Sequence, residues 1–180
     1  MTDAELAVLS LVGQEPRHGY EIEQVIEARG MRDWTAIGFS SIYYLLKKLE
    51  GEGLMEGRLE KAERGPARKV FHITPAGREA LHSALLDVLS VPVACHSRLL
   101  LGVSNLPGVA PGEAVAALQQ YHGTLLTRQE ELRARWQSQR PLPYFVDALF
   151  DHSLTMIQAE ADWVQTFMAQ VQAEPQAEGE

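Results

Sequence analysis

The sequence predicts a mainly α-helical protein with one small β-hairpin. Apolar residues recur at three-to-four spacing along most of the chain, which is the period of an amphipathic helix. At Leu54 the period changes, and over residues 54–73 two short apolar runs flank a turn rich in glycine, proline and basic residues. A hydrophobic content of 46% suffices for a sizeable core, and no apolar run is long enough to span a membrane.

Three helices are predicted in the first fifty residues. The helical spacing over residues 4–12 predicts a first helix that stops at Gly13. After a linking segment, residues 14–21, a second helix ends near Gly30.

The third helix covers residues 40–51, and Ser40 or Ser41 can cap its free backbone N–H groups. At 100° per residue, one narrow arc must face the core. This arc holds Ile42, Leu45, Leu46 and Leu49, whereas the opposite side holds Ser40, Tyr44, Lys47 and Lys48. Tyr43 lies at the edge of the core face and is assigned to packing.

Two short strands, residues 54–59 and 70–73, follow the third helix. The turn between them carries a cluster of positive charges, Lys61, Arg64, Arg68 and Lys69. Thr74 then caps a fourth helix, with Pro75 at its first position, and this helix continues to Val91. The order helix, helix, helix, strand, basic loop, strand, helix is that of a winged helix-turn-helix.

The remainder is predicted to be helical, with a short segment at 96–102 and long helices at about 111–138 and 144–171. These ranges predict a winged helix over residues 1–90, a helical dimerisation domain over 91–172 and a disordered acidic tail over 173–180. Two amphipathic helices joined by a short break form only a thin hairpin, which leaves apolar surface for a second copy to cover. The alternative is a monomer whose hairpin folds back onto the winged helix.

Charge and composition exclude several classes of protein. The chain has a formal charge of -8, but residues 40–78 carry 8 basic against 5 acidic residues, so a local patch can still bind an anion. One cysteine, Cys95, excludes an internal disulfide framework and fits a reducing cytoplasm. The histidines show no metal-ligand spacing, and His18 is expected to cap or pack. No motif for catalysis or for a cofactor appears, so the protein is not expected to be an enzyme.

Three segments, LSLVGQEPRHGYEIEQVI, SSIYYLLKKLEGEGLMEG and GPARKVFHITPAGREAL, resemble the PadR family of bacterial transcriptional regulators. The resemblance covers residues 4–90 closely. It implies a cytoplasmic DNA-binding regulator, usually a repressor that a small molecule relieves, with carboxy-terminal helices exchanged within a homodimer. The sequence departs from the family pattern at Ser40–Ser41, where Gly-Thr is usual, and at Tyr44, where proline is frequent. Both changes lie on the expected DNA face.

The expected DNA-binding residues lie on the third helix and on the wing. A helix in the major groove presents its amino-terminal side chains to the bases, while positive residues contact phosphates. The candidates are Ser40, Ser41, Tyr44, Lys47 and Lys48 on the helix and Arg64, Arg68 and Lys69 on the wing. The alternative reading of these charges is a solvated outer face and a soluble turn.

The favoured function is therefore a homodimeric repressor that reads a pseudo-palindromic operator in double-stranded DNA. A second hypothesis adds a small aromatic effector, bound near Trp34, Trp136 or Trp163 at the dimer interface; the alternative is that these tryptophans are core residues. A third hypothesis is a winged helix that contacts another protein, or an activator without small-molecule sensing. Asp147 and Asp151, one helical turn apart, are assigned to a solvated face.

Overall fold

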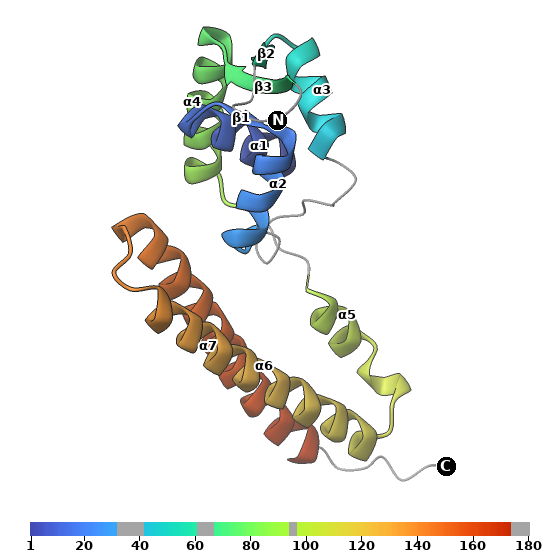
Figure 1. Ribbon diagram of the computed structural model, residues 1–180. Helices are drawn as coiled ribbons and strands as arrows, with labels where there is room; N and C mark the ends of the chain where they lie inside the picture. Colours follow the sequence, from blue (N-terminus) through green and yellow to red (C-terminus); the bar gives the residue numbers. More distant parts are fainter. Residues whose placement is uncertain (32–41, 61–66, 94–96, 174–180) are drawn as a thin grey trace. The chain divides into compact units, whose positions relative to one another are not determined.

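The helices and strands follow one another in the predicted order, which confirms the fold class: mainly helical, with one small antiparallel sheet (Figure 1). The computed structural model describes residues 1–31, 42–60, 67–93 and 97–173. The chain divides into two compact units, Met1–Ala94 and Cys95–Glu180. Each unit has an apolar core of its own.

The first unit is a winged helix. Its elements are α1 (Asp3–Gln14), β1 (Arg17–His18), α2 (Gly19–Ala28), α3 (Ile42–Gly51), β2 (Met55–Glu60), β3 (Arg68–Ile73) and α4 (Pro75–Ser90). Capping side chains fix three of the helix starts. Thr2 and Glu5 form a capping box at α1, His18 and Glu21 form one at α2, and Thr74 accepts from the Gly77 amide at α4.

The sheet contains one strand that the sequence did not predict. Residues 14–21 were expected to be a link, but Arg17 and His18 pair antiparallel with β3, which gives the strand order β1-β3-β2. A strand of two residues is too short to show an alternating pattern. This strand places the start of α2 beside the wing.

The predicted start of the second wing strand was also wrong. β3 begins at Arg68 rather than at Val70, so Arg68 and Lys69 belong to the strand and not to the basic loop. They pair with Glu60 and Leu59 of β2. Basic residues have little strand propensity, which explains why the sequence pattern placed them in the turn.

The core of the first unit lies between α1, α2, α3 and the sheet. The predicted apolar arc of α3 is buried as expected and packs against α1 and α2; the fully buried side chains include Val8, Leu9, Leu11, Ile22, Ile26, Ile42, Leu46 and Leu49. On α4, Leu81 packs against this core, whereas Leu85, Leu86, Val88 and Leu89 are exposed.

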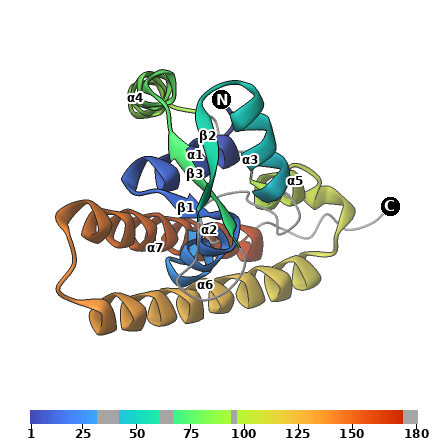
Figure 2. The ribbon, with the colours of Figure 1, turned by 45° about the horizontal axis from the view of Figure 1, so that its top comes forward.

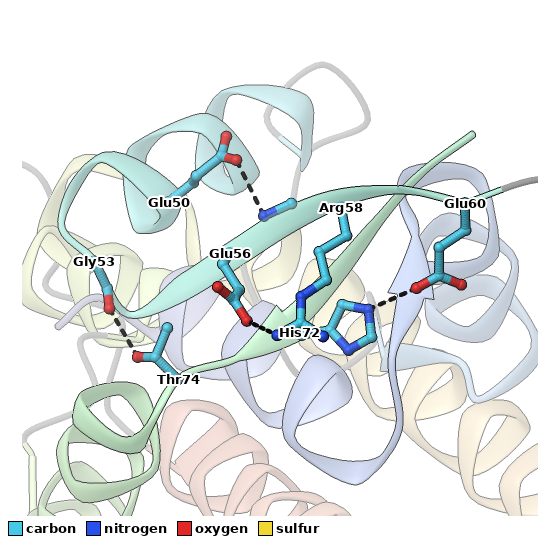
Figure 3. Close-up of polar contacts among 8 residues, drawn as sticks. Glu50, Gly53, Glu56, Arg58, Glu60, His72 and Thr74 are labelled. Atoms are coloured by element: carbon cyan, nitrogen blue, oxygen red, sulfur yellow. Dashed lines mark hydrogen bonds and ion pairs between the residues drawn. The ribbon is translucent and has the colours of Figure 1, made fainter. Parts of the chain in front are cut away.

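The turn after α3 is joined directly to the start of α4. Thr74 donates from its hydroxyl to the Gly53 carbonyl oxygen at 2.7 Å, and its amide donates to the Leu54 carbonyl oxygen at 3.1 Å (Figure 3). Gly77 approaches the same turn so closely that a Cβ there would lie 1.9 Å from the Leu54 carbonyl oxygen. These contacts fix where α3 ends and the wing begins.

The second unit contains α5 (Arg98–Ser104), the 3-10 helix η3 (Leu106–Gly108), α6 (Pro111–Gln139) and α7 (Tyr144–Ala173). α6 and α7 form the predicted hairpin and lie side by side along their lengths (Figure 2). Leu118, Leu125, Ile157 and Val164 are buried between them. Across the described ranges, no helix is both long enough and apolar enough to cross a membrane.

Candidate nucleic-acid interface

The exposed face of α3 is the centre of the candidate site. Because the apolar arc of this helix is buried, the opposite side must face solvent. Tyr44 is 67% exposed there, and Lys47 is exposed beside it. Ser40 and Ser41, expected at the start of the same helix, lie outside the described residues.

Lys48 is not a simple solvent-facing charge. Its ammonium group is paired with the carboxylate of Glu5 on α1, whose side chain is only 8% exposed, and lies 3.8 Å from a carboxylate oxygen of Glu52. The other oxygen of Glu5 accepts from the Thr2 amide at 2.8 Å. The hydrogen bond from Lys48 lowers the pKa of the Glu5 carboxyl, and the same contact raises the pKa of Lys48. Lys48 therefore ties α3 to the first turn of α1.

Lys69 is also paired with a carboxylate. Its Nζ atom donates to Oε2 of Glu50, on the last turn of α3, at 2.7 Å and lies 5.3 Å from the centre of the Phe71 ring. This hydrogen bond lowers the pKa of Glu50. Arg64, another of the expected DNA-binding residues on the wing, lies outside the described residues.

An open hollow of about 540 Å³ lies where the start of α2, the start of α3 and β3 meet. It is lined by His18, Gly19, Tyr20, Tyr43, Arg68, Lys69 and Phe71. The two tyrosines are 58% and 63% exposed, so their hydroxyl groups are accessible for hydrogen bonding. The hollow thus combines two cations with two exposed phenols.

His18 lies at the edge of this hollow, and its hydrogen bonds fix the tautomer of its ring. Its Nδ1 atom accepts from the Glu21 amide at 3.2 Å, so Nδ1 carries no proton and a neutral ring is protonated at Nε2. That Nε2 atom lies 3.1 Å from Oε1 of Glu21 and 3.3 Å from Nη1 of Arg68. Because Nε2–H is a donor, the contact with the imidazole satisfies none of the N–H groups of Arg68.

The sequence predicted the role of His18 but missed the hollow. The expectation that His18 caps or packs is confirmed, since it is the N-cap of α2. Tyr43 was assigned to packing, yet it is 63% exposed, although its ring lies against Gly19, where a Cβ would be 2.8 Å from Cε1 of Tyr43. The contact between α2 and β3 joins distant parts of the chain, and no local sequence signal reports it.

The candidate effector residues of the second unit are not grouped. Trp136 donates from Nε1 to Oδ1 of Asp147 at 2.6 Å and stacks on Phe150 at 6.1 Å between ring centres, so Asp147 has a structural role beyond a solvated face. Trp163 is 42% exposed and stacks on Phe167. Trp163 lies 13 residues beyond Phe150 on α7, or about 20 Å along the helix axis. Trp34 lies outside the described residues.

Comparison with known proteins identifies the first unit. Residues 8–83 match the model of the transcriptional regulator PadR-like family. The first unit carries a domain of this family. The family is one of transcriptional regulators and not of enzymes, in agreement with the expectation that this protein is not an enzyme. Over 80 residues the chain is 39% identical to an uncharacterised 37.1 kDa protein of a Streptomyces fradiae transposon; the match covers 44% of this chain and 21% of that protein.

Solved structures of PadR proteins share the fold across nearly the whole chain. Bacillus subtilis PadR bound to operator DNA has a TM-score of 0.76 at 20% identity, covering 93% of this chain and 98% of that one. The same protein bound to p-coumaric acid has a TM-score of 0.79 at 19% identity, with the same coverage. A PadR-like regulator from Bacillus cereus has a TM-score of 0.70 at 19% identity, covering 96% and 100%. At these identities the similarity is one of fold.

The Glu5 carboxylate predicts a specific loss of stability in acid. Its pKa is lowered in the folded chain, so its stabilising contribution is present above the unfolded value, about 4.3, and is lost as the pH falls through the folded value. We expect Glu5→Gln to be less stable than the wild type at pH 7 and the two stabilities to converge as the pH falls through the folded pKa of Glu5. Thermal unfolding followed by circular dichroism between pH 3 and 7 measures this. If the stabilities of the wild type and of Glu5→Gln change in parallel over this pH range, the ion pair with Lys48 contributes nothing to the stability of the fold.

Proposed function

We propose that this protein is a DNA-binding transcriptional regulator that acts as a homodimeric repressor on a pseudo-palindromic operator. The observation that carries the proposal is the exposed face of α3, with Tyr44 and Lys47, beside the basic stem of the wing. Membership of a family of transcriptional regulators supports it. So does the shared fold with Bacillus subtilis PadR, which has been solved with operator DNA.

In this proposal α3 enters the major groove. Tyr44, in its first turn, approaches the base edges together with Ser40 and Ser41, which precede α3 in the sequence, and Lys47 contacts a phosphate. Arg64 and Arg68 lie in or beside the adjacent minor groove, where a narrow groove concentrates negative potential. Lys48 and Lys69 lie at the edge of this basic surface, where each is paired with a carboxylate.

The hollow beside α3 suits a backbone phosphate. The Arg68 guanidinium can donate two N–H groups to one phosphate, and the hydroxyl groups of Tyr20 and Tyr43 are further donors. Such contacts fix the register of a protein on DNA without reading its sequence. We therefore add Tyr20 and Tyr43 to the proposed interface, as residues that orient α3.

The titration that tests DNA binding uses the DNA upstream of the protein's own gene across a salt series. The logarithm of affinity should fall linearly with the logarithm of salt concentration, and Lys47→Ala should make the slope shallower by about 0.9, the value of one phosphate contact. Arg78→Ala is the matched control, because Arg78 is exposed on α4, on the opposite side of the unit from α3 (Figure 1). Absence of salt-dependent binding at low salt would refute the proposal.

The homodimer is supported by an apolar stripe on α7 that the hairpin leaves uncovered. Leu149, Met156 and Trp163 follow one another at intervals of seven residues and are 48%, 56% and 42% exposed. Phe145, also exposed, lies one turn before Leu149. A seven-residue apolar repeat is the pattern of a helix that packs along another helix. The buried face of α7 points towards α6, so a second copy is the occupant we propose for this stripe.

Disrupting the stripe should separate the protomers. We expect light scattering to give twice the chain mass of 20.0 kDa for the wild type and a single chain mass for the Leu149→Glu, Met156→Glu double variant. Thr155→Glu, which places one carboxylate at an exposed position on another side of α7, should remain dimeric. A monomeric wild type at micromolar concentration would favour the folded-back alternative.

A small aromatic effector is the finer part of the proposal. It is supported by the exposed indole of Trp163 and by the structure of Bacillus subtilis PadR with p-coumaric acid. Trp136 and Trp163 are too far apart on one hairpin to line one small pocket, so a pocket containing both needs residues from two protomers.

With p-coumaric acid as the probe, we expect quenching of tryptophan fluorescence and a matched loss of DNA affinity. Trp163→Phe should remove most of the quenching while leaving the helix intact. The two effects must be linked, because a ligand shifts DNA binding only by its differential affinity for the two states. Quenching with unchanged DNA affinity would indicate a binding pocket and no switch.

A protein-binding winged helix is the alternative. The observation in its favour is that Lys48 and Lys69, two of the expected phosphate contacts, are already paired with carboxylates. An activator without small-molecule sensing is the other alternative. The salt titration separates the first alternative from DNA binding, and a reporter gene under the upstream DNA separates repression from activation.

A further inference from the structure

Glu50 links the end of α3 to both strands of the wing. One carboxylate oxygen accepts from the Gly57 amide of β2 at 3.1 Å, and the other accepts from Nζ of Lys69 on β3 at 2.7 Å. In Figure 3 the side chain of Glu50 extends from α3 towards β2. A single side chain therefore connects the proposed recognition helix with the two strands that carry the wing.

A side chain at position 57 would overlap the present positions of Lys69 and Glu50. A Cβ on Gly57 would lie 2.0 Å from Cε of Lys69 and 2.7 Å from Oε1 of Glu50. Gly57 pairs with Phe71 across the sheet, and Leu59 pairs with Lys69, so Gly57, Lys69 and Phe71 share one face. The lysine stem crosses the bare backbone at Gly57, and its ammonium group lies between Glu50 and the Phe71 ring.

We infer that Glu50 is a positioning residue that holds the wing against the recognition helix and withholds the charge of Lys69 from non-specific phosphate contacts. The inference rests on the proposed DNA-binding function. Specific binding requires that the helix and the wing reach their grooves together, whereas non-specific binding requires only positive charge near phosphates. A carboxylate that fixes the geometry and neutralises one cation therefore favours the operator over other DNA.

The side chain is suited to an isosteric test because it is only partly buried. Glu50→Gln keeps an oxygen that can accept from the Gly57 amide but removes the ion pair with Lys69. The free lysine then adds one phosphate contact, so the salt slope on a non-operator duplex should become steeper by about 0.9, and affinity at 0.1 M salt should rise by up to about eightfold. The ratio of operator to non-operator affinity should fall.

A second variant, Gly57→Ala, should also release Lys69 from Glu50, and it changes no charge. In Gly57→Ala the new methyl group overlaps the present positions of the Lys69 stem and the Glu50 carboxylate, so we expect these two side chains to separate and the non-operator slope again to become steeper. Glu79→Gln is the control for a change in net charge alone, because Glu79 is exposed on α4. The double variant Glu50→Gln, Lys69→Gln should return to the wild-type slope, which assigns the added contact to Lys69.

The outcomes separate this inference from the function on which it rests. If the wild type binds neither duplex in a salt-dependent way, the proposed function fails, and this inference fails with it. If the wild type binds but Glu50→Gln and Gly57→Ala keep its slope and its operator preference, this inference alone is overturned. Lower stability with unchanged slopes would assign Glu50 a purely structural role, which also overturns it.

Discussion

The burial of one face of α3 is the constraint on which the rest of the first unit depends. Four apolar side chains of this short helix are buried against α1 and α2, which fixes its rotation about its own axis. Burial of such side chains contributes roughly 1.5–3 kcal/mol each, so turning Tyr44 and Lys47 inward would lose most of the local stability. The face available to a partner is therefore determined by the core, and the polar side chains only complete it.

Two carboxylates within the basic region help to hold α3 in this orientation. Glu5 connects α3 to α1 through Lys48, and Glu50 connects α3 to the wing through Lys69. Both lie at the periphery of a surface that we propose meets a polyanion, where carboxylates are unfavourable for simple attraction. Their placement makes sense if the orientation of α3 matters more than the number of positive charges. An acidic protein with a small, well-oriented basic surface also associates less with bulk nucleic acid.

The sequence was sufficient for features that depend on local periodicity. The four core residues of α3, the cap at Thr74 and the two long helices follow from spacing within one element. The pairs Lys48–Glu5 and Lys69–Glu50 could not be predicted, because their members are 43 and 19 residues apart and meet only through the tertiary fold. Tyr43 was misjudged for a related reason: its neighbour across the packed helices is Gly19, which has no side chain to cover the ring. The hollow could not be predicted from the sequence because it depends on β1, a strand of two residues.

The capping box at α1 has a practical consequence for handling the protein. Thr2 and Glu5 satisfy each other's backbone amides, and the same Glu5 carboxylate pairs with Lys48 of α3. A purification tag or cleavage scar that replaces Thr2 removes the cap and frees the carboxylate to adopt another rotamer. An affinity measured on such material would then describe an altered α3 rather than the native one. Protein for quantitative work should keep Thr2 unchanged.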